Sequence, residues 1–250
     1  MTKQSVQFGS LAWGLQTGGR LSTWDKIQLS IKALGTQIQE AFRKNRFPIP
    51  LDPKSIQLPD TVLVRNTLEY IREEHQTPLQ HHCLRSFVIG ELFGLSEKLK
   101  YDSEILAVSA LLHDLGLEEK HCGLHPGIDC FAIEGALEAG KFLESLQMVS
   151  PEKTKIIQDA IAFHLNISIP ASDVEAYLLN KGTATDTIGF YLKDLSSQTV
   201  NSLMELYPRL DFNASVHQQL KHQSKIRPHS RMAFLYQNGF GTRLMKVRFE

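Results

Sequence analysis

The stretch "LLHDLG", residues 111–116, places a histidine and an aspartate side by side directly after two leucines. Both polar side chains are costly to bury unless a partner compensates them. They follow an apolar segment, 105–112, whose pattern and preceding Asp102 cap predict a helix that packs into the core. We expect Gly116 to end this region in the left-handed conformation that glycine adopts readily. The pair therefore stands where a buried helix gives way to a loop.

The composition is that of an ordinary globular protein, with 250 residues, 42% hydrophobic and 22% charged. Lysine plus arginine and aspartate plus glutamate both number 27, so the net charge gives no reason to expect nucleic acid or a membrane as a partner. A local basic patch around Arg227, Arg231 and Arg243 is the one exception that the sequence leaves open.

The three cysteines show no paired spacing, which argues against a disulfide framework and favours a reducing compartment. The first residues contain no apolar stretch of the kind found in signal peptides, and no 18-residue apolar run predicts a membrane span. A cytoplasmic location is therefore expected, while export by another kind of signal stays open.

Helical patterns run along the chain without convincing strand alternation, so the predicted fold class is all-α. A helix is expected from Thr23 toward Arg46, because apolar residues recur there at steps of three and four. Several prolines then punctuate the stretch that ends at Pro59. We interpret 1–58 as an N-terminal appendage docked on the core, irregular apart from one helix, and 59–250 as the core with a C-terminal extension.

The core is expected to consist of helices throughout. Asp60 is the predicted cap of its first helix, and Pro151 the first residue of another. Further helices are predicted at 79–93, 132–146, 173–180, 185–192 and 196–207.

Histidines on other helices give His113 and Asp114 a possible partner. An isolated pair of this kind is more often a polar turn facing water, but a divalent cation would satisfy both groups. His164 lies on the apolar stripe of its predicted helix. Either His81 or His82 could face inward from the helix predicted at 79–93, since periodicity does not choose between them. Helices of one bundle can direct such side chains to a buried metal.

The segment "HCGLHPGIDC", 121–130, also contains residue types that bind zinc. It lacks the paired spacing of a small structural zinc site, so we interpret it as a loop over an active site. Cys83 is interpreted as a small buried residue. Motifs of serine hydrolases, P-loop proteins and dinucleotide-binding proteins are absent from the sequence.

Five segments occur in an order that resembles the HD-domain metal-dependent hydrolase superfamily, and within it the branch that includes cyanamide hydratase. They are "HHCLRSF", "LLHDLG", "FAIEGALEAGKFL", "AIAFHLN" and "GTATDTIGF", and the resemblance spans roughly 59–192. The superfamily is an all-α helical bundle. The resemblance selects His82 over His81, because Arg85 follows it at the His-x-x-Arg spacing, and it implies the metal ligands His82, His113, Asp114 and Asp186.

The resemblance also bears on the number of metal ions. Dinuclear members carry a further histidine where this chain has Phe131, so one divalent ion is expected, with zinc favoured over iron or manganese. Relatives of the branch often carry glutamate where this chain has Ala132, whereas Glu134 is retained.

The function that the resemblance implies is that of an enzyme in which the metal activates water to attack a small substrate, such as a nitrile or cyanamide. We expect His164 to transfer a proton, with Lys120 and Glu134 as further catalytic candidates. The predicted substrate-binding residues are Arg85, His121 and His125, although Arg85 could instead pair with Glu134.

Two alternatives stay open. One is hydrolysis of a nucleotide or another phosphate ester, for which Arg72, Arg85 and Lys120 are the available cations. The other is a degenerate domain that binds without catalysis. A homo-oligomer is left open as a further partner.

Overall fold

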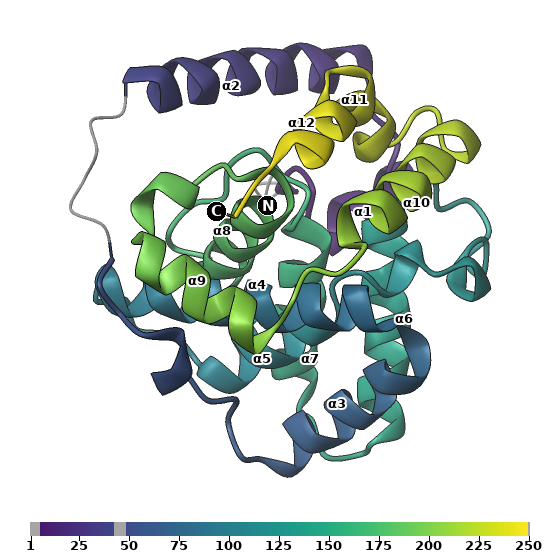
Figure 1. Ribbon diagram of the computed structural model, residues 1–250. Coiled ribbons are helices and arrows are strands. Elements are labelled where there is room, and N and C mark those ends of the chain that lie inside the picture. The colour runs from purple at the N-terminus through teal and green to yellow at the C-terminus, as the bar shows by residue number, and fades with distance from the viewer. Residues whose placement is uncertain (1–5, 43–48, 250) are drawn as a thin grey trace.

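The computed structural model describes residues 6–42 and 49–249. Over these ranges the chain forms helices and no strand beyond isolated bridges, which confirms the predicted all-α fold (Figure 1). The α-helices are α1 (Leu11–Thr17), α2 (Thr23–Phe42), α3 (Val62–Glu74), α4 (Thr77–Ser96), α5 (Ser103–Leu112), α6 (Phe131–Ser145), α7 (Pro151–Phe163), α8 (Val174–Ile188), α9 (Ser197–Leu206), α10 (Phe212–Ile226), α11 (Arg231–Gln237) and α12 (Phe240–Lys246).

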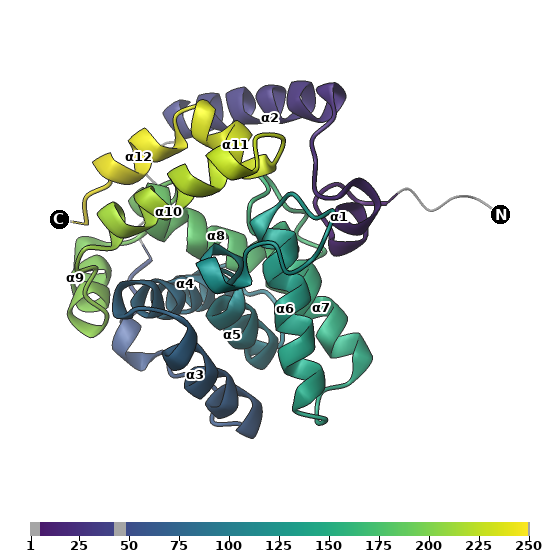
Figure 2. The same cartoon turned by 90° about the vertical axis from the view of Figure 1, so that its right-hand side faces the viewer.

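Helices α4 to α8 form the centre of the molecule, and α4 packs most extensively against α8 (Figure 2). Two glycines allow this pair to approach closely. A Cβ added at Gly90 would lie 3.1 Å from the carbonyl oxygen of Leu178, and one at Gly182 would overlap the carbonyl oxygen of Ser86. This close approach brings Asp186, one helical turn after Gly182 on α8, next to side chains of α4.

Helix α5 is buried along nearly its whole length, from Ile105 to Leu112. Asp102 caps it as predicted, because its side chain accepts hydrogen bonds from the backbone N–H groups of Glu104 and Ile105. The prediction that Gly116 adopts the left-handed conformation is wrong, because its φ is not positive. An added Cβ would overlap the carbonyl oxygen of Phe131 at the start of α6. Close packing against α6, rather than a left-handed turn, requires glycine at this position.

Several predicted helix ends differ from the structure. Thr61, not Asp60, caps α3, because the Thr61 hydroxyl accepts the hydrogen bond from the N–H of Val64. Pro151 opens α7 as predicted. The two short helices predicted over 173–192 form one continuous helix, α8, which ends at the left-handed Gly189. Nothing in their sequence breaks the helix between them.

The N-terminal residues are docked on the centre. The backbone N–H of Leu11 donates to the Asp159 carboxylate on α7, and Gly14 packs against Ile133 of α6. The predicted helix after Thr23 is confirmed as α2 as far as Phe42. The rest of the prediction, toward Arg46, lies outside the described residues.

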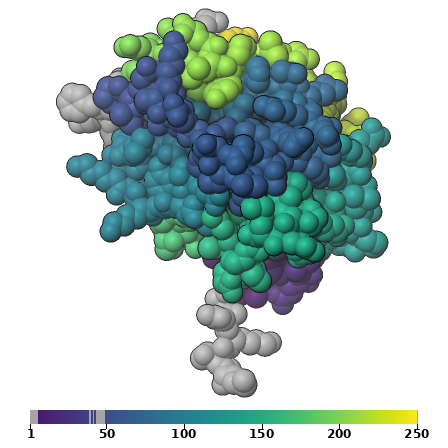
Figure 3. Space-filling view, turned by 90° about the horizontal axis from the view of Figure 1, so that it is seen from below, coloured from purple at the N-terminus to yellow at the C-terminus, as the bar shows by residue number. Residues whose placement is uncertain are grey.

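Helix α2 lies across one side of the molecule, next to α11 and α12 (Figures 1 and 2). Only Leu29 of its large apolar residues is buried, where it packs with Trp13 and Leu21. The apolar residues whose spacing predicted the helix stay largely exposed to solvent, although Leu34 also lines the cavity described below; they are Ile27, Ile31, Leu34, Ile38 and Phe42. The face opposite α2 is formed mainly by residues between about 50 and 165, with lime-coloured residues from the C-terminal part of the chain along its top (Figure 3).

No helix in the described part of the chain combines the length and apolar character needed to cross a membrane. The three cysteines are free, and Cys83 is fully buried.

The packing of Gly116 generates a first prediction. Gly116→Ala should lower the free energy of unfolding by at least about 2 kcal/mol, because the added methyl group must push α6 away from the segment after α5. Gly35→Ala is the matched control, since a Cβ there meets no atom within 4 Å and alanine favours the helix. Urea unfolding measures both. Equal stability of the two variants would contradict the close approach.

Candidate metal centre

Three buried side chains from two helices converge at the heart of the molecule. His82 lies on α4, and His113 and Asp114 follow the last residue of α5. The Nε2 atoms of His82 and His113 are 3.2 Å apart, and Asp114 Oδ2 lies 3.5 Å and 3.1 Å from them. Ligands at zinc distances in a tetrahedral shell are separated by about 3.3 Å. The three atoms therefore fit the ligand shell of one divalent ion.

The hydrogen bonds of the two Nδ1 atoms determine that the Nε2 atoms of His82 and His113 face the centre of the group. His113 Nδ1 lies 2.8 Å from the carbonyl oxygen of Ala110, and His82 Nδ1 lies 2.6 Å from Asp186 Oδ2. A carbonyl oxygen only accepts hydrogen bonds, so His113 Nδ1 carries the proton, and the Asp186 carboxylate favours the same tautomer of His82. Both Nε2 lone pairs then point at each other beside a carboxylate, an arrangement that a cation stabilises.

The charges around the cluster attract positive charge to it. Burial lowers the pKa of His113, but the Asp114 carboxylate outweighs burial and raises that pKa well above its ordinary value. Among the described residues, His82, His113 and Asp114 form the one group with the spacing of a metal site.

His164 stands at the edge of the cluster. Its Nδ1 donates to the Ile161 carbonyl oxygen at 2.6 Å, and its Nε2 lies 3.8 Å from Asp114 Oδ1. Burial and the neighbouring charge of His113 lower the pKa of His164 to about 3. The imidazole is therefore neutral near pH 7, and its Nε2 lone pair can accept a hydrogen bond. Phe131 packs its ring against His164, with centroids 5.7 Å apart.

Asp186 lies next to this group but does not face the same point. Its carboxylate accepts hydrogen bonds from Arg85 Nε at 2.7 Å, from Arg85 Nη2 at 2.9 Å and from Arg209 Nη1 at 2.9 Å. It meets His82 through Nδ1, on the side of the ring away from His113. In this structure Asp186 orients His82, and its expected place as a fourth ligand stays a prediction.

The expected role of Arg85 in substrate binding needs correction. Arg85 is fully buried, bonded to Asp186 and to the carbonyl oxygens of Tyr207 and Pro208. Nor does it pair with Glu134, whose carboxylate is bound by Arg227. A fully buried Glu134 held by an arginine does not reach the centre, so its proposed catalytic role is not supported by its position.

The residues expected from the loop after the centre also lie elsewhere. Lys120 and His121 both contact the Glu74 carboxylate, at 2.7 Å and 2.5 Å, and His125 contacts Glu138 at 2.6 Å. These three side chains tie the loop to α3 and α6 rather than facing the centre. Their positions therefore do not support the predictions that Lys120 is catalytic and that His121 and His125 bind the substrate.

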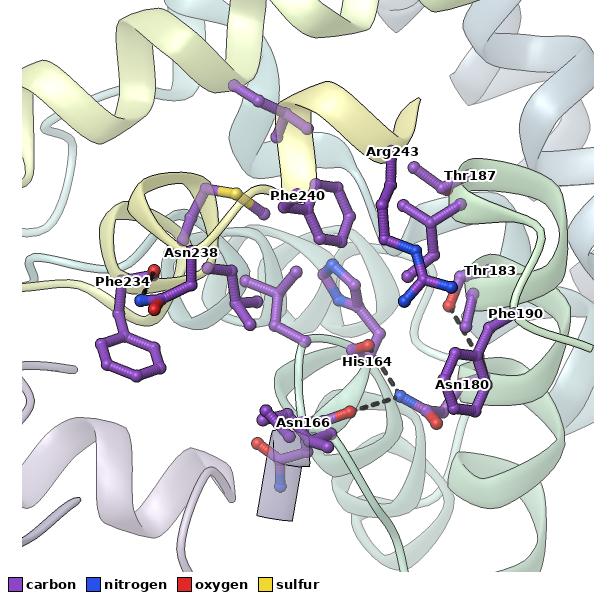
Figure 4. Close-up of a pocket in the computed structure, with 18 of the residues that line it drawn as sticks. His164, Asn166, Asn180, Thr183, Thr187, Phe190, Phe234, Asn238, Phe240 and Arg243 are labelled. Carbon is purple, nitrogen blue, oxygen red and sulfur yellow. Dashed lines mark hydrogen bonds between the residues drawn. The ribbon is translucent and has the colours of Figure 1, made fainter. Parts of the chain in front are cut away.

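A cavity of about 310 Å³ opens from the centre (Figure 4). His82, His113, Asp114 and His164 form part of its wall, and Leu117 contributes from the segment after α5. Phe131 of α6 and residues 165–167 after α7 also contribute. Much of the remaining wall comes from α2, α8 and the C-terminal helices α10, α11 and α12. The N-terminal appendage therefore shapes the cavity, whereas most of the loop 117–130 does not.

The basic residues of the C-terminal tail do not form a surface patch. Arg227 binds Glu134, and Arg231 is fully buried on the Asn166 side chain and the Ala162 carbonyl oxygen. The sequence shows these cations and carboxylates, but spacing alone does not pair Asp186 with Arg209 or Glu134 with Arg227.

Compared with known proteins, the chain matches no family model and no curated protein.

The buried Asp186 generates the second prediction. Asp186→Asn should lower the free energy of unfolding by about 3–5 kcal/mol, because it leaves Arg85 and Arg209 buried without a counter-charge. Urea unfolding of metal-free protein measures the change. Asp60→Asn is the control, since its ion pair with Arg65 is exposed and should contribute little. A nearly unchanged stability of Asp186→Asn would refute the role assigned to this carboxylate.

The third prediction concerns pH. Burial raises the pKa of Asp186, but the charges of Arg85 and Arg209 outweigh it and hold that pKa well below the ordinary value. A carboxyl group with a depressed pKa in the folded state stabilises the fold above its unfolded pKa of about 3.9, and this contribution is lost as the pH falls toward the folded value. The stability difference between wild type and Asp186→Asn should therefore be constant from pH 7 to 5 and shrink below about pH 4. A difference that grows with acid would contradict this sign.

Proposed function

We propose that this protein is a metal-dependent hydrolase or hydratase that uses one divalent ion, zinc before iron or manganese, to activate water for attack on a small organic molecule. The observation that carries the proposal is the convergence of His82 Nε2, His113 Nε2 and an Asp114 oxygen within 3.5 Å of one another on the wall of a cavity. Two neutral nitrogens and one carboxylate suit such ions.

The chemistry that a divalent ion supplies when bound is the activation of water near neutral pH, because it lowers the pKa of that water. His164 is placed to orient that water by accepting a hydrogen bond at Nε2, which its bond to the Ile161 carbonyl leaves free. Asp186 holds His82 in the tautomer that presents Nε2, and the Ala110 carbonyl does the same for His113.

The resemblance to HD-domain hydrolases supports this proposal from a separate direction. It selected His82 over His81 by motif alone, and His82 lies in the cluster whereas His81 is bonded to the carbonyl oxygen of Pro208. We propose membership of that superfamily on the five ordered segments and on this placement. Free cysteines are compatible with a cytoplasmic protein, and we include that location in the proposal.

Phosphate-ester hydrolysis receives less support. It needs several cations that reach the substrate, but Arg243 is the one lysine or arginine among the described residues that line the cavity. Arg85 and Arg209 are bound by Asp186, and Lys120 is bound by Glu74 outside the cavity. The cavity wall is instead mostly apolar.

The fourth prediction tests the metal. Wild-type protein loaded with zinc and dialysed should retain about one ion per chain by elemental analysis, since the expected ligands form a single group. His113→Ala should lose it. His81→Ala is the matched control and should retain it, because His81 faces the carbonyl oxygen of Pro208.

Retention of zinc by His113→Ala, or its absence from the wild type, would refute the metal centre. Assays of the loaded protein against small nitriles and against phosphate esters then separate the two reaction classes. Turnover of phosphate esters alone would overturn the proposed class.

A further inference from the structure

The cavity is much larger than a nitrile or cyanamide requires. Its volume of about 310 Å³ lies in the range of sites for drug-sized molecules. The wall away from the histidines is formed largely by aliphatic and aromatic side chains from α8 and the residues just after it, and from α10, α11 and α12, among them Ile188, Phe190, Leu220, Met232 and Phe240. Such a wall favours a molecule with an apolar body.

Polar groups on this wall are mostly engaged with the protein itself. Asn180 donates to the carbonyl oxygens of His164 and Asn166, and Thr183 donates to the carbonyl oxygen of Asn180 (Figure 4). Asn238 is bonded to the Phe234 carbonyl oxygen. These groups therefore complete the backbone hydrogen bonding of the wall.

Arg243 is the charged group of this wall. It is the one lysine or arginine among the described residues that line the cavity. Figure 4 shows its side chain reaching from α12 into the space near Thr183, Phe190 and His164. Its guanidinium stands 5.7 Å from the centroid of the Phe190 ring, and the side chain is 41% exposed. A charged group with this access can bind an incoming anion.

We propose that the cavity binds an organic carboxylate with an apolar body, whose carboxylate pairs with Arg243 while the rest of the molecule extends toward the histidine cluster. This inference rests on the proposed function in that it names the substrate class of the same site. One arginine suits a singly charged carboxylate, which it can bind through two parallel hydrogen bonds. A phosphate dianion would leave charge uncompensated on this wall.

Glu40 competes with any bound carboxylate for Arg243. Its carboxylate accepts a hydrogen bond from Arg243 Nη2 at 3.0 Å, which connects α2 to α12 beside the cavity. Ser30, Ala33, Leu34, Thr36 and Gln37 of the same helix line the cavity. A bound carboxylate would therefore replace Glu40 on Arg243, and removing the Glu40 charge should favour the ligand.

The test uses the full-length protein freed of metal with EDTA, so that a carboxylate cannot bind through an ion. Isothermal titration calorimetry compares phenyl-substituted alkanoates, from phenylacetate to 6-phenylhexanoate, with the matched amides. At least one acid should bind about 10-fold or more tightly than its amide, as expected for hydrogen bonds to a charged group. Acetate, which lacks the apolar body, should bind far more weakly.

Arg243→Gln should abolish the preference for the acid while leaving the affinity for the amide unchanged. Lys246→Gln removes the same charge from an exposed position on α12 and should bind like the wild type. Glu40→Gln should bind the acid more tightly. Equal affinity of acid and amide in the wild type, no binding of any acid, or a preference that persists in Arg243→Gln would each overturn the inference.

The metal measurement separates the two proposals. If wild-type protein holds one zinc ion but binds the acid no more tightly than the amide, the carboxylate inference alone is overturned. Binding that depends on Arg243 in a protein that holds no zinc would overturn the proposed metal chemistry alone.

Discussion

The buried carboxylate of Asp186 is the interaction on which the centre depends. It joins α8 to α4 through Arg85 and to the segment before α10 through Arg209, and all three side chains are largely or fully buried. The same carboxylate accepts a hydrogen bond from the Nδ1–H of His82. Because the two arginines keep it ionised and fixed, the ring of His82 has one orientation, with Nε2 toward His113. A structural ion pair thus sets the geometry of a chemical site.

The other half of the centre is set by packing. The buried helix α5 ends at Leu112, and Gly116 lets the following segment lie directly on α6. His113 and Asp114 stand between these two constraints, with His113 Nδ1 held by the last turn of α5. Packing therefore supplies the rigidity that a preorganised site needs. The cavity beyond the centre is closed by segments distant in sequence, α2 and the C-terminal helices, and these give it an apolar wall with one arginine.

Local patterns in the sequence predicted the helices, the Asp102 cap and the inward position of His164, because each depends on neighbours within a few residues. The choice of His82 over His81 needed a motif. Partners far apart in the chain were beyond such reasoning: spacing carries no information on whether Arg85 meets Asp186 or Glu134, or on which carboxylates bind His121 and His125. The apolar stripe of α2 predicted a helix correctly, but which face of it is buried depends on tertiary contacts.

The most direct measurement is a crystal structure of the zinc-loaded protein with anomalous scattering recorded at the zinc edge. The account predicts one peak within about 2.0–2.2 Å of His82 Nε2, His113 Nε2 and an oxygen of Asp114. A zinc peak at the histidines of the 121–130 loop instead, or no peak beside His113, would contradict it.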